Sequence, residues 1–403
     1  MAVKVKIHGL GIKDMLKFKK MPEAREKKIA AAKPEEVSAV FKINENARRL
    51  HPDYQNMIID EIIEHTGANA KTFILKRADG YKAASFRAGQ YISVLLKIGD
   101  TVTTRPYSIS SAPALTKSGR YAITVRATNA GFASEYILNN WNIGDRVTVS
   151  DPQGNFFYDD IRDPQNIIAI AGGSGITPFL SMAAAIRDKT EKFNLTILYG
   201  SKTKDSILFE EELNKITSET DKVKVIHVLS DEEAEGFEHG FITSELILKY
   251  APIDNYSVFI CGPEAMYKFI EKETAALSLP SKNIRREMLG VTKNISSVKG
   301  FPSDISDKTF TLTVRLGGEE YTVPAAANEP ILVAIERAGI PAPSRCRSGE
   351  CGWCRSKLVD GKIFCPAENE YRRWADKQAG YIHPCCTFAI SNCTIEISGT
   401  YIK

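Results

Sequence analysis

The spacing of hydrophobic residues changes character twice along this chain of 403 residues. Between about residues 54 and 151, apolar and β-branched residues alternate with polar ones in short runs bounded by Gly, Asn, Asp or Pro. These runs are MIIDEIIEH, KTFILKRA, QYISVLLKI, RPYSISSA, YAITVRAT and DRVTVSD. Such alternation predicts strands, and strands at this spacing favour a closed antiparallel barrel.

From residue 166 to residue 277, buried strands alternate with amphipathic helices. The strands are NIIAIAGG, NLTILYGS, KVIHVLS and YSVFICG, and each is followed by a helical run: TPFLSMAAAIRD, LFEEELNKI, TSELILKY and EAMYKFIEKETAAL. This order is typical of an α/β domain in which helices cover both faces of a parallel sheet.

The two ends of the chain follow other patterns. Residues 14–32 have a helical composition that is interrupted at Pro22. After a polar stretch rich in Gly and Pro, FTLTVRLGGEEYTV predicts a hairpin around Gly317 and Gly318, and EPILVAIERAG predicts a helix. We therefore expect a multidomain protein. Its expected segments are a basic extension (1–53), a β-barrel domain (54–160), an α/β domain (161–288), a linker (289–307) and a cysteine-rich domain (308–403).

Composition narrows the protein class. The 43% hydrophobic and 25% charged fractions are those of a globular protein. No apolar run reaches the roughly 18 residues that a membrane span needs, and the N-terminus lacks the apolar segment of a secretory signal. We therefore expect a cytoplasmic protein without a transmembrane segment.

Charge is concentrated at the N-terminus. Residues 1–50 hold 13 basic and 6 acidic residues, a net charge of +7, so a net charge of +4 for the whole chain leaves −3 for the remainder. Such a segment is either a solvated extension or a docking surface for an acidic partner or a membrane. Basic residues do not interleave with aromatic ones, so we do not expect nucleic-acid binding.

Seven of the eight cysteines follow residue 345. In CRSGECGWCRSKL, four residues separate Cys346 from Cys351 and two separate Cys351 from Cys354. Zinc ribbons usually offer two cysteine pairs, and a redox Cys-x-x-Cys motif would not need Cys346. Spacings of four and then two, with a distant fourth cysteine, form the plant-type [2Fe–2S] pattern. Gly349 and Gly352 suit a loop that wraps a cluster.

Three further motifs have both a functional and a structural interpretation. IAIAGGSGITPF, at a strand–helix junction, could bring backbone close to a phosphate, or it could be a packing feature. VFICGPEAMY places Cys261 at the carboxyl edge of the sheet, where ligands bind, or it contains a buried structural cysteine. RPYSISS places Arg105 and Tyr107 on one face of a strand, suited to a phosphate and a flat ring, or it is a surface strand.

Together, and in this order, RPYS, GGSGITP and CGP resemble the ferredoxin–NADP reductase family of flavoprotein reductases over about residues 54–288. The resemblance implies FAD, with Arg105 on the flavin phosphate, Tyr107 against the isoalloxazine and Ser108 at its reactive nitrogen. NAGFASEYI resembles the family turn that holds the FAD pyrophosphate through Gly131 and Ser134. The implied cofactor-binding set is Arg105, Pro106, Tyr107, Ser108, Gly131, Ser134, Gly172, Gly173, Gly175, Thr177, Pro178, Cys261, Gly262 and Pro263, with Ser108 and Cys261 as catalytic residues.

The segment CRSGECGWCRSKLVDGKI resembles plant-type ferredoxins, which implies an α+β domain of the β-grasp type. Its [2Fe–2S] ligands would be Cys346, Cys351 and Cys354, with Cys385 as the fourth. Cys385 leaves 30 residues after Cys354, as the family pattern requires, and GYIHPCC resembles the usual ending. Cys386 follows directly, where the family seldom has a cysteine, and Cys365 lies too close to Cys354.

The domain order resembles reductases of the phthalate dioxygenase reductase type. NAD(P)H gives a hydride, which carries two electrons, whereas an iron–sulfur cluster accepts one at a time, so flavin between them forms an electron relay. We expect a one-electron acceptor protein such as an oxygenase, a hydroxylase or another metalloenzyme. Two alternatives stay open: an oxidoreductase that reduces its own substrate at the flavin, and an electron-input component of a larger complex docked through residues 1–53.

The choice of coenzyme depends on LYGSKTKDS. Lys202 and Lys204 follow the second strand of the α/β domain, where a basic side chain could bind the 2′-phosphate of NADPH. The arginine that would better serve this purpose is absent. We therefore favour NADH.

Overall fold

The computed structural model describes residues 11–32, 41–128, 131–287, 290–291 and 294–398. The outermost part of the basic extension (1–10), residues 33–40, the last residue of the predicted α/β domain and parts of the predicted linker (288–289 and 292–293), and the C-terminal residues 399–403 lie outside this description. The chain divides into two units, residues 1–47 and residues 48–403.

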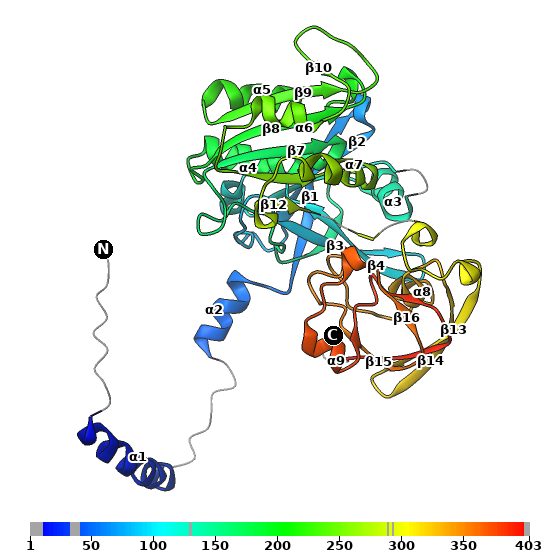
Figure 1. The fold of residues 1–403 in the computed structure, drawn as a ribbon. Helices are drawn as coiled ribbons and strands as arrows, with labels where there is room; N and C mark the ends of the chain where they lie inside the picture. The colour runs from blue at the N-terminus through cyan, green and yellow to red at the C-terminus, as the bar shows by residue number, and fades with distance from the viewer. Residues whose placement is uncertain (1–10, 33–40, 129–130, 288–289, 292–293, 399–403) are drawn as a thin grey trace. The chain divides into compact units, whose positions relative to one another are not determined.

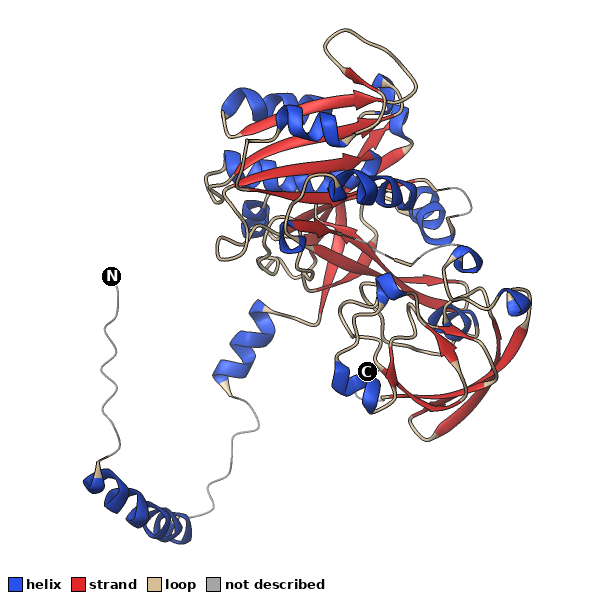
Figure 2. Ribbon diagram, in the orientation of Figure 1, coloured by secondary structure: helices blue, strands red, loops and turns tan. Residues whose placement is uncertain are grey.

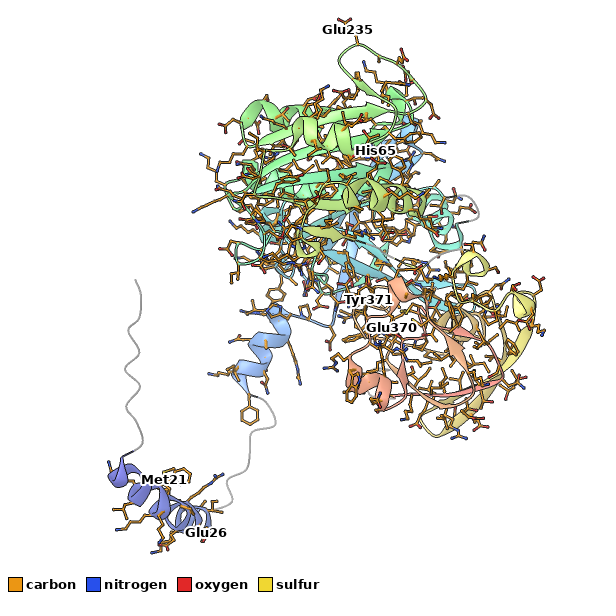
Figure 3. The ribbon with its side chains drawn as sticks, viewed as in Figure 1. Met21, Glu26, His65, Glu235, Glu370 and Tyr371 are labelled. Carbon is orange, nitrogen blue, oxygen red and sulfur yellow. The ribbon has the colours of Figure 1, made fainter. Side chains whose placement is uncertain are left out.

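The first unit contains α1 (Ile12–Ala31) and most of α2 (Lys42–Leu50). The predicted interruption at Pro22 is wrong, because α1 continues through this residue. Proline lacks one N–H group, but the Ala, Glu, Lys and Arg residues around it have high helix propensity and offset the loss. Met21 and Glu26 mark this helix in Figure 3, and no residue of α2 is buried.

The first sheet of the second unit is antiparallel, as predicted. Its strands are β1 (Tyr54–His65), β2 (Ala70–Arg77), β3 (Tyr91–Ile98), β4 (Thr101–Ser108), β5 (Arg120–Arg126) and β6 (Arg146–Ser150), and α3 (Phe132–Asn140) lies between β5 and β6 in the chain. The strand order is β4-β3-β6-β1-β2-β5. The sheet curves around an apolar core. A bridge between Ile109, just after β4, and Ile123 on β5 joins its two edge strands, in agreement with the predicted barrel.

The second sheet is parallel throughout, also as predicted (Figures 1 and 2). Its elements are β7 (Asn166–Gly172), α4 (Thr177–Arg187), β8 (Asn194–Ser201), α5 (Glu210–Glu219), β9 (Val223–Leu229), β10 (Glu238–His239), α6 (Ser244–Tyr250), β11 (Tyr256–Cys261), α7 (Glu264–Ala275) and β12 (Ile284–Arg286). One apolar cluster joins the sheet to α4 and α5, and another joins it to α6 and α7, because successive strand residues face opposite sides.

The third sheet is mixed. The elements of this region are β13 (Thr309–Leu316), β14 (Glu319–Ala326), α8 (Ile331–Arg337), β15 (Ser356–Asp360), β16 (Ile363–Phe364), α9 (Trp374–Gln378), β17 (Tyr381–Ile382), β18 (Phe388–Ala389) and β19 (Cys393–Ile397). The main sheet has the order β14-β13-β19-β15-β17, with β13 parallel to β19 and the other pairs antiparallel. The predicted hairpin around Gly317 and Gly318 is confirmed, and both glycines have positive φ.

The segment that connects the second and third sheets is packed over its described residues. Ile295, Phe301 and Ile305 are buried and contact Ala327 and Phe388 of the third region. Within the described part of the chain, no helix combines the length and the apolar character needed to cross a membrane.

Candidate functional site

Strand β4 carries the RPYS motif, and its arginine is unusually placed. The Arg105 guanidinium donates to Thr103 Oγ1 at 2.5 Å and to the Thr104 carbonyl at 2.7 Å. Burial, together with the nearby cation Arg347, lowers the pKa of Arg105 to about 10. A half-buried cation whose hydrogen bonds go to neutral oxygens is stabilised by an anionic ligand. Arg105 therefore fits a flavin phosphate.

The last residue of β4, Ser108, contacts a residue that follows β12 of the second sheet. Pro106 and Tyr107 are partly buried, and burial raises the pKa of the Tyr107 phenol. Ser108 is buried, and its Oγ donates to Glu287 Oε2 at 3.0 Å. The Cys261 Sγ approaches the same carboxylate oxygen at 3.9 Å. Glu287 thus brings the two predicted catalytic residues, Ser108 and Cys261, to one place.

Glu287 is a candidate site residue that the sequence motifs did not reveal. Its side chain is 7% exposed, and burial raises the pKa of its carboxyl to about 8, opposed by the hydrogen bond from Ser108. At neutral pH most Glu287 carboxyls therefore carry a proton. A carboxylic acid kept neutral in an apolar site can donate a hydrogen bond or hold a proton for transfer.

The short strand β12 places Glu287 beside Cys261. The Glu287 N–H donates to the Ile260 carbonyl at 3.0 Å, which extends the pairing of β12 with β11. Arg285 forms a buried ion pair with Asp163 at 2.7 Å and fixes this edge of the sheet. The only sequence signal was a three-residue strand, Ile284–Arg286, followed directly by a carboxylate, and such a strand is too short to recognise alone.

The glycine-rich loop and the CGP segment lie against each other. A Cβ on Gly175 would lie 2.1 Å from the Cys261 carbonyl oxygen, and a Cβ on Gly172 would lie 2.9 Å from Pro263 Cδ. Only glycine allows this approach, so packing explains part of the motif. Gly173 adopts a positive φ of 53°, and the loop runs directly into α4, whose first turn contains Thr177 and Pro178.

A basic side chain from the first sheet also reaches this loop. Arg126, at the end of β5, has its Nη1 atom 2.4 Å from the position of a Cβ on Gly173. The Gly262 N–H is held by Tyr267 Oη at 3.2 Å. A guanidinium beside a glycine turn at the start of a helix is suited to a phosphate or pyrophosphate. The loop therefore fits a nicotinamide dinucleotide, and Arg126 is a second residue that the motifs did not reveal.

Gly131 and Ser134 lie at the start of α3. The Ser134 and Thr128 hydroxyls are 3.0 Å apart, and Ser134 Oγ also donates to the Gly131 carbonyl at 3.2 Å. A Cβ on Gly131 would lie 2.2 Å from both hydroxyl oxygens. This compact group of hydroxyls at a helix start fits the pyrophosphate role that the resemblance implied.

Four cysteine thiols from two segments come together in the third region. Cys346 interacts with Cys351 and Cys385, and Cys385 also interacts with Cys354 and Cys386. Hydrogen bonds from Cys351 and Cys385 lower the pKa of the Cys346 thiol and favour its thiolate form. Thiolates are the form that binds iron. These contacts place Cys385 among the other three predicted ligands.

The loop between these cysteines directs backbone N–H groups at sulfur. The Ser348 and Cys351 N–H groups point to Cys346 Sγ, and the Trp353 N–H points to Cys351 Sγ, each at 3.4 Å. Gly349 and Gly352 have φ values of 89° and 68°, which other residues rarely adopt. Converging thiols with N–H donors around them fit a [2Fe–2S] cluster.

Residues on both sides of Cys346 contact the first sheet, whose strand β4 carries RPYS and which is called the flavin-site sheet below. Ser344 Oγ lies 2.6 Å from Thr104 Oγ1 on β4, and Arg347 Nη1 donates to Thr103 Oγ1 at 3.3 Å. Arg347 is itself held by a buried ion pair with Glu336 at 2.6 Å. The strand that carries RPYS is thus in direct contact with the loop that carries the cysteines.

Comparisons with known proteins agree with these sites. A model of the oxidoreductase FAD-binding domain matches residues 61–158, a model of the oxidoreductase NAD-binding domain matches residues 169–272, and a model of the 2Fe-2S iron-sulfur cluster binding domain matches residues 314–390. The predicted cofactors FAD, NAD(P)H and [2Fe–2S] are therefore confirmed.

Similar proteins cover different shares of the chain. The chain is 32% identical over 282 residues to flavohemoprotein A of Dictyostelium discoideum, covering 66% of this chain and 68% of that protein. It is 30% identical over 318 residues to one of the subunits of 1,2-phenylacetyl-CoA epoxidase from Escherichia coli (strain K12), covering 75% of this chain and 86% of that protein. The structure of phthalate dioxygenase reductase superposes with a TM-score of 0.61 at 25% identity and covers 86% of this chain and 98% of its own.

Proposed function

We propose, because this chain belongs to the phthalate dioxygenase reductase-like flavoprotein reductases, that its natural electron acceptor is a terminal oxygenase or hydroxylase. The chain is an NAD(P)H-dependent flavin and iron–sulfur oxidoreductase. When bound, FAD would supply two-electron chemistry with a hydride, and the [2Fe–2S] cluster would supply transfer of single electrons. Oxygenase metal centres consume single electrons, so they match this output.

We assign the cofactors to the residues described above. Arg105 would bind the flavin phosphate, Tyr107 would lie against the isoalloxazine, and Gly131 and Ser134 would hold the pyrophosphate. The nicotinamide dinucleotide would bind along the glycine loop, with its reactive ring near Cys261. The full nucleotide set is Gly172, Gly173, Gly175, Thr177, Pro178, Cys261, Gly262 and Pro263, and the cluster ligands are Cys346, Cys351, Cys354 and Cys385.

Ser108, Cys261 and Glu287 form the proposed reaction centre. The Ser108 hydroxyl can donate to a flavin nitrogen when it turns from Glu287, and the Glu287 carboxyl can replace the proton that Ser108 gives up. The buried Cys261 thiol has a raised pKa, caused by burial and then by Glu287, so it stays neutral and packs rather than ionises. Because all three residues are buried, they keep water away from the site of hydride transfer.

We favour NADH as the coenzyme. The Lys204 N–H is bound by Glu232 Oε2 at 2.9 Å, and the Lys204 ammonium lies 5.6 Å over the Phe237 ring. The Lys202 carbonyl accepts a hydrogen bond from the Asp231 N–H at 3.0 Å. The Glu232 carboxylate beside Lys204 would repel a 2′-phosphate, whereas it could accept a hydrogen bond from a 2′-hydroxyl.

The basic extension is proposed to dock the acceptor. Leu16, Phe18 and Met21 of α1 are more than half exposed on a helix rich in lysine. Exposed apolar side chains among cations suit a partner surface that is acidic around an apolar centre. The cytoplasmic location stays a prediction, supported by a set of cysteines suited to a reducing compartment.

The contact between the cysteine loop and β4 is the single observation that best supports a relay to a separate acceptor. The test is anaerobic stopped-flow mixing of the loaded protein with NADH, in which the flavin should be reduced before the cluster absorbance falls. Added oxygenase should then reoxidise the cluster, and ferricyanide should serve as the control acceptor. The proposal would be contradicted if no oxygenase reoxidised the reduced cluster and the protein instead turned over a small organic substrate.

A further inference from the structure

Two cysteines outside the proposed ligand set lie together beside the cluster loop. Cys365 directly follows β16, and Cys386 precedes β18 by one residue. These strands pair antiparallel, with Phe364 opposite Phe388, so the chain carries both cysteines to the same end of the ribbon. The ribbon places Cys365 and Cys386 near each other although 20 residues separate them in the chain.

The two sulfur atoms share a neighbour and interact with each other. Cys365 Sγ lies 3.8 Å and Cys386 Sγ 3.6 Å from the same atom, the Asn369 carbonyl oxygen. A direct interaction between the two thiols is also present. Asn369 lies in the loop just before Glu370 and Tyr371, which are labelled in Figure 3.

The exposure of the pair is unequal. Cys386 is 0% exposed, whereas Cys365 is partly exposed, so a small solute would meet Cys365 first. Cys386 Sγ lies 2.6 Å from the position of a Cβ on Gly349, inside the loop between Cys346 and Cys351. A bond formed at Cys386 would therefore act directly on the loop that surrounds the cluster.

A buried cysteine is often only a small apolar side chain, and Cys393 of the same region is of that kind. Its Sγ lies 3.2 Å from the Lys362 carbonyl and 3.1 Å from the Ser391 carbonyl, and within the described residues no cysteine thiol interacts with it. Cys365 and Cys386 differ because each has a second thiol as its neighbour. This difference points to chemistry rather than packing.

We propose that Cys365 and Cys386 form a reversible disulfide next to the cluster, with hydrogen peroxide as the oxidant. The Cys365 sulfur would attack the peroxide, break its O–O bond, become a sulfenic acid and release one water. The Cys386 sulfur would then attack the sulfenic sulfur and form the S–S bond, while the S–O bond breaks and the hydroxide leaves with the Cys386 thiol proton as a second water. The two thiols together thus lose two protons and two electrons, and one peroxide becomes two waters. A small thiol would reverse the change by exchange.

The test uses the full chain with its flavin and cluster. Peroxide is added in steps, and iron and acid-labile sulfide are measured at every step. Free thiols are then alkylated under denaturing conditions, and the protein is digested for mass spectrometry. We expect a Cys365–Cys386 link, lighter by two hydrogen atoms, at doses that leave the iron content unchanged, and dithiothreitol should remove it.

Variants separate this bond from other outcomes. Cys365→Ser and Cys386→Ser should each keep the iron and lose the link, whereas Cys393→Ser should keep both. A link that forms only after iron is lost would overturn the proposal, as would a link between Cys385 and Cys386 or intact thiols at every dose. Loss of iron in Cys386→Ser would also overturn it, because Cys386 would then be a ligand.

Discussion

The Arg345 guanidinium donates to the Asp151 carboxylate at 2.6 Å, although the two residues are 194 positions apart in the chain. The same guanidinium lies 3.5 Å over the Trp353 ring and donates to the Asp53 carbonyl at 2.9 Å. Arg345 precedes Cys346, and Trp353 precedes Cys354. One buried side chain therefore connects the flavin-site sheet to both ends of the cysteine loop.

Replacing Arg345 by Gln should slow electron transfer from the flavin to the cluster and leave reduction of the flavin by NADH unchanged. A hydrogen bond between charged groups contributes about 1.5–3 kcal/mol. Its loss should lower the population of molecules in which the cysteine loop contacts the flavin-site sheet by roughly tenfold or more. Stopped-flow absorbance resolves the two steps. Arg337→Gln is the matched control. The Arg337 side chain is 51% exposed, and its ion pair with Glu329 lies within the region of the third sheet. Equal effects in both variants would argue against a docking role for Arg345.

Replacing Arg105 by Ala should weaken flavin retention. The half-buried guanidinium donates to neutral oxygens, so its removal deletes the charge that we assign to the flavin phosphate. The expected loss is about 1.5–3 kcal/mol, or roughly ten- to hundredfold in affinity. Flavin content after dialysis measures it. Arg146→Ala, an exposed arginine on β6 of the same sheet, should retain its flavin. If Arg105→Ala keeps full occupancy, the assignment is wrong.

Local patterns predicted most of the fold and much of the site. Alternating apolar residues in the first sheet, and continuous apolar runs in the second, identified the long strands of these two sheets, because the pattern within each strand reflects whether one or both of its faces are buried. The continuity of α1 through Pro22 was missed. One lost backbone hydrogen bond does not outweigh the helix propensity of the residues around it. The short strand β12 carries too few residues to show any period.

The site residues that escaped prediction depend on the order of strands in the sheets. Glu287 has no motif of its own, and its role follows only from the pairing of β12 with β11 beside Cys261. Arg126 and Arg345 likewise become informative only when distant segments meet. By contrast, Cys346, Cys351 and Cys354 lie in one loop, where spacing along the chain already reflects distance in space.

Glu287→Gln should change how stability depends on pH. The folded carboxyl has a pKa of about 8, whereas the unfolded one is near 4.3. Between these values the folded protein binds a proton that the unfolded chain has released, so stability falls as pH rises. From about pH 5 to about pH 9, the free energy of unfolding of the wild type should therefore fall by up to a few kcal/mol relative to that of the Gln variant. Urea unfolding at several pH values, with FAD in excess, measures the difference.

The matched control is Glu271→Gln on α7, a glutamate whose side chain is 66% exposed. Its unfolding free energy should follow that of wild type across the same pH range. A difference between wild type and Glu287→Gln that stays constant with pH would mean that Glu287 is ionised in the folded protein.

Removing residues 1–50 should leave the flavin content and the NADH–ferricyanide turnover unchanged. No proposed cofactor residue lies in this segment, and α2, which ends at Leu50, buries none of its side chains. The truncation stops before Asp53, whose carbonyl binds Arg345. Turnover with the protein acceptor should fall, because the proposed docking helices are gone. Loss of flavin would show instead that the extension belongs to the flavin domain.

Replacing Cys385 by Ser should disturb the cluster far more than replacing Cys386 by Ser. Cys385 interacts with Cys346 and Cys354, whereas Cys386 interacts with Cys365 as well as with its neighbour Cys385. Only one of two adjacent side chains can complete a ligand set fixed by the cysteine loop. Cys385→Ser should therefore lose iron, sulfide, the visible absorbance of the cluster and electron transfer to a protein acceptor.

Both variants should keep reduction of the flavin by NADH, because Ser108, Cys261 and Glu287 do not contact either cysteine in the described structure. Iron analysis and electron paramagnetic resonance of the reduced proteins distinguish them. If Cys386→Ser is the variant that loses its cluster, the ligand assignment is shifted by one residue. If neither loses it, the fourth thiolate comes either from Cys365, which contacts this doublet, or from whichever of Cys385 and Cys386 remains in each variant.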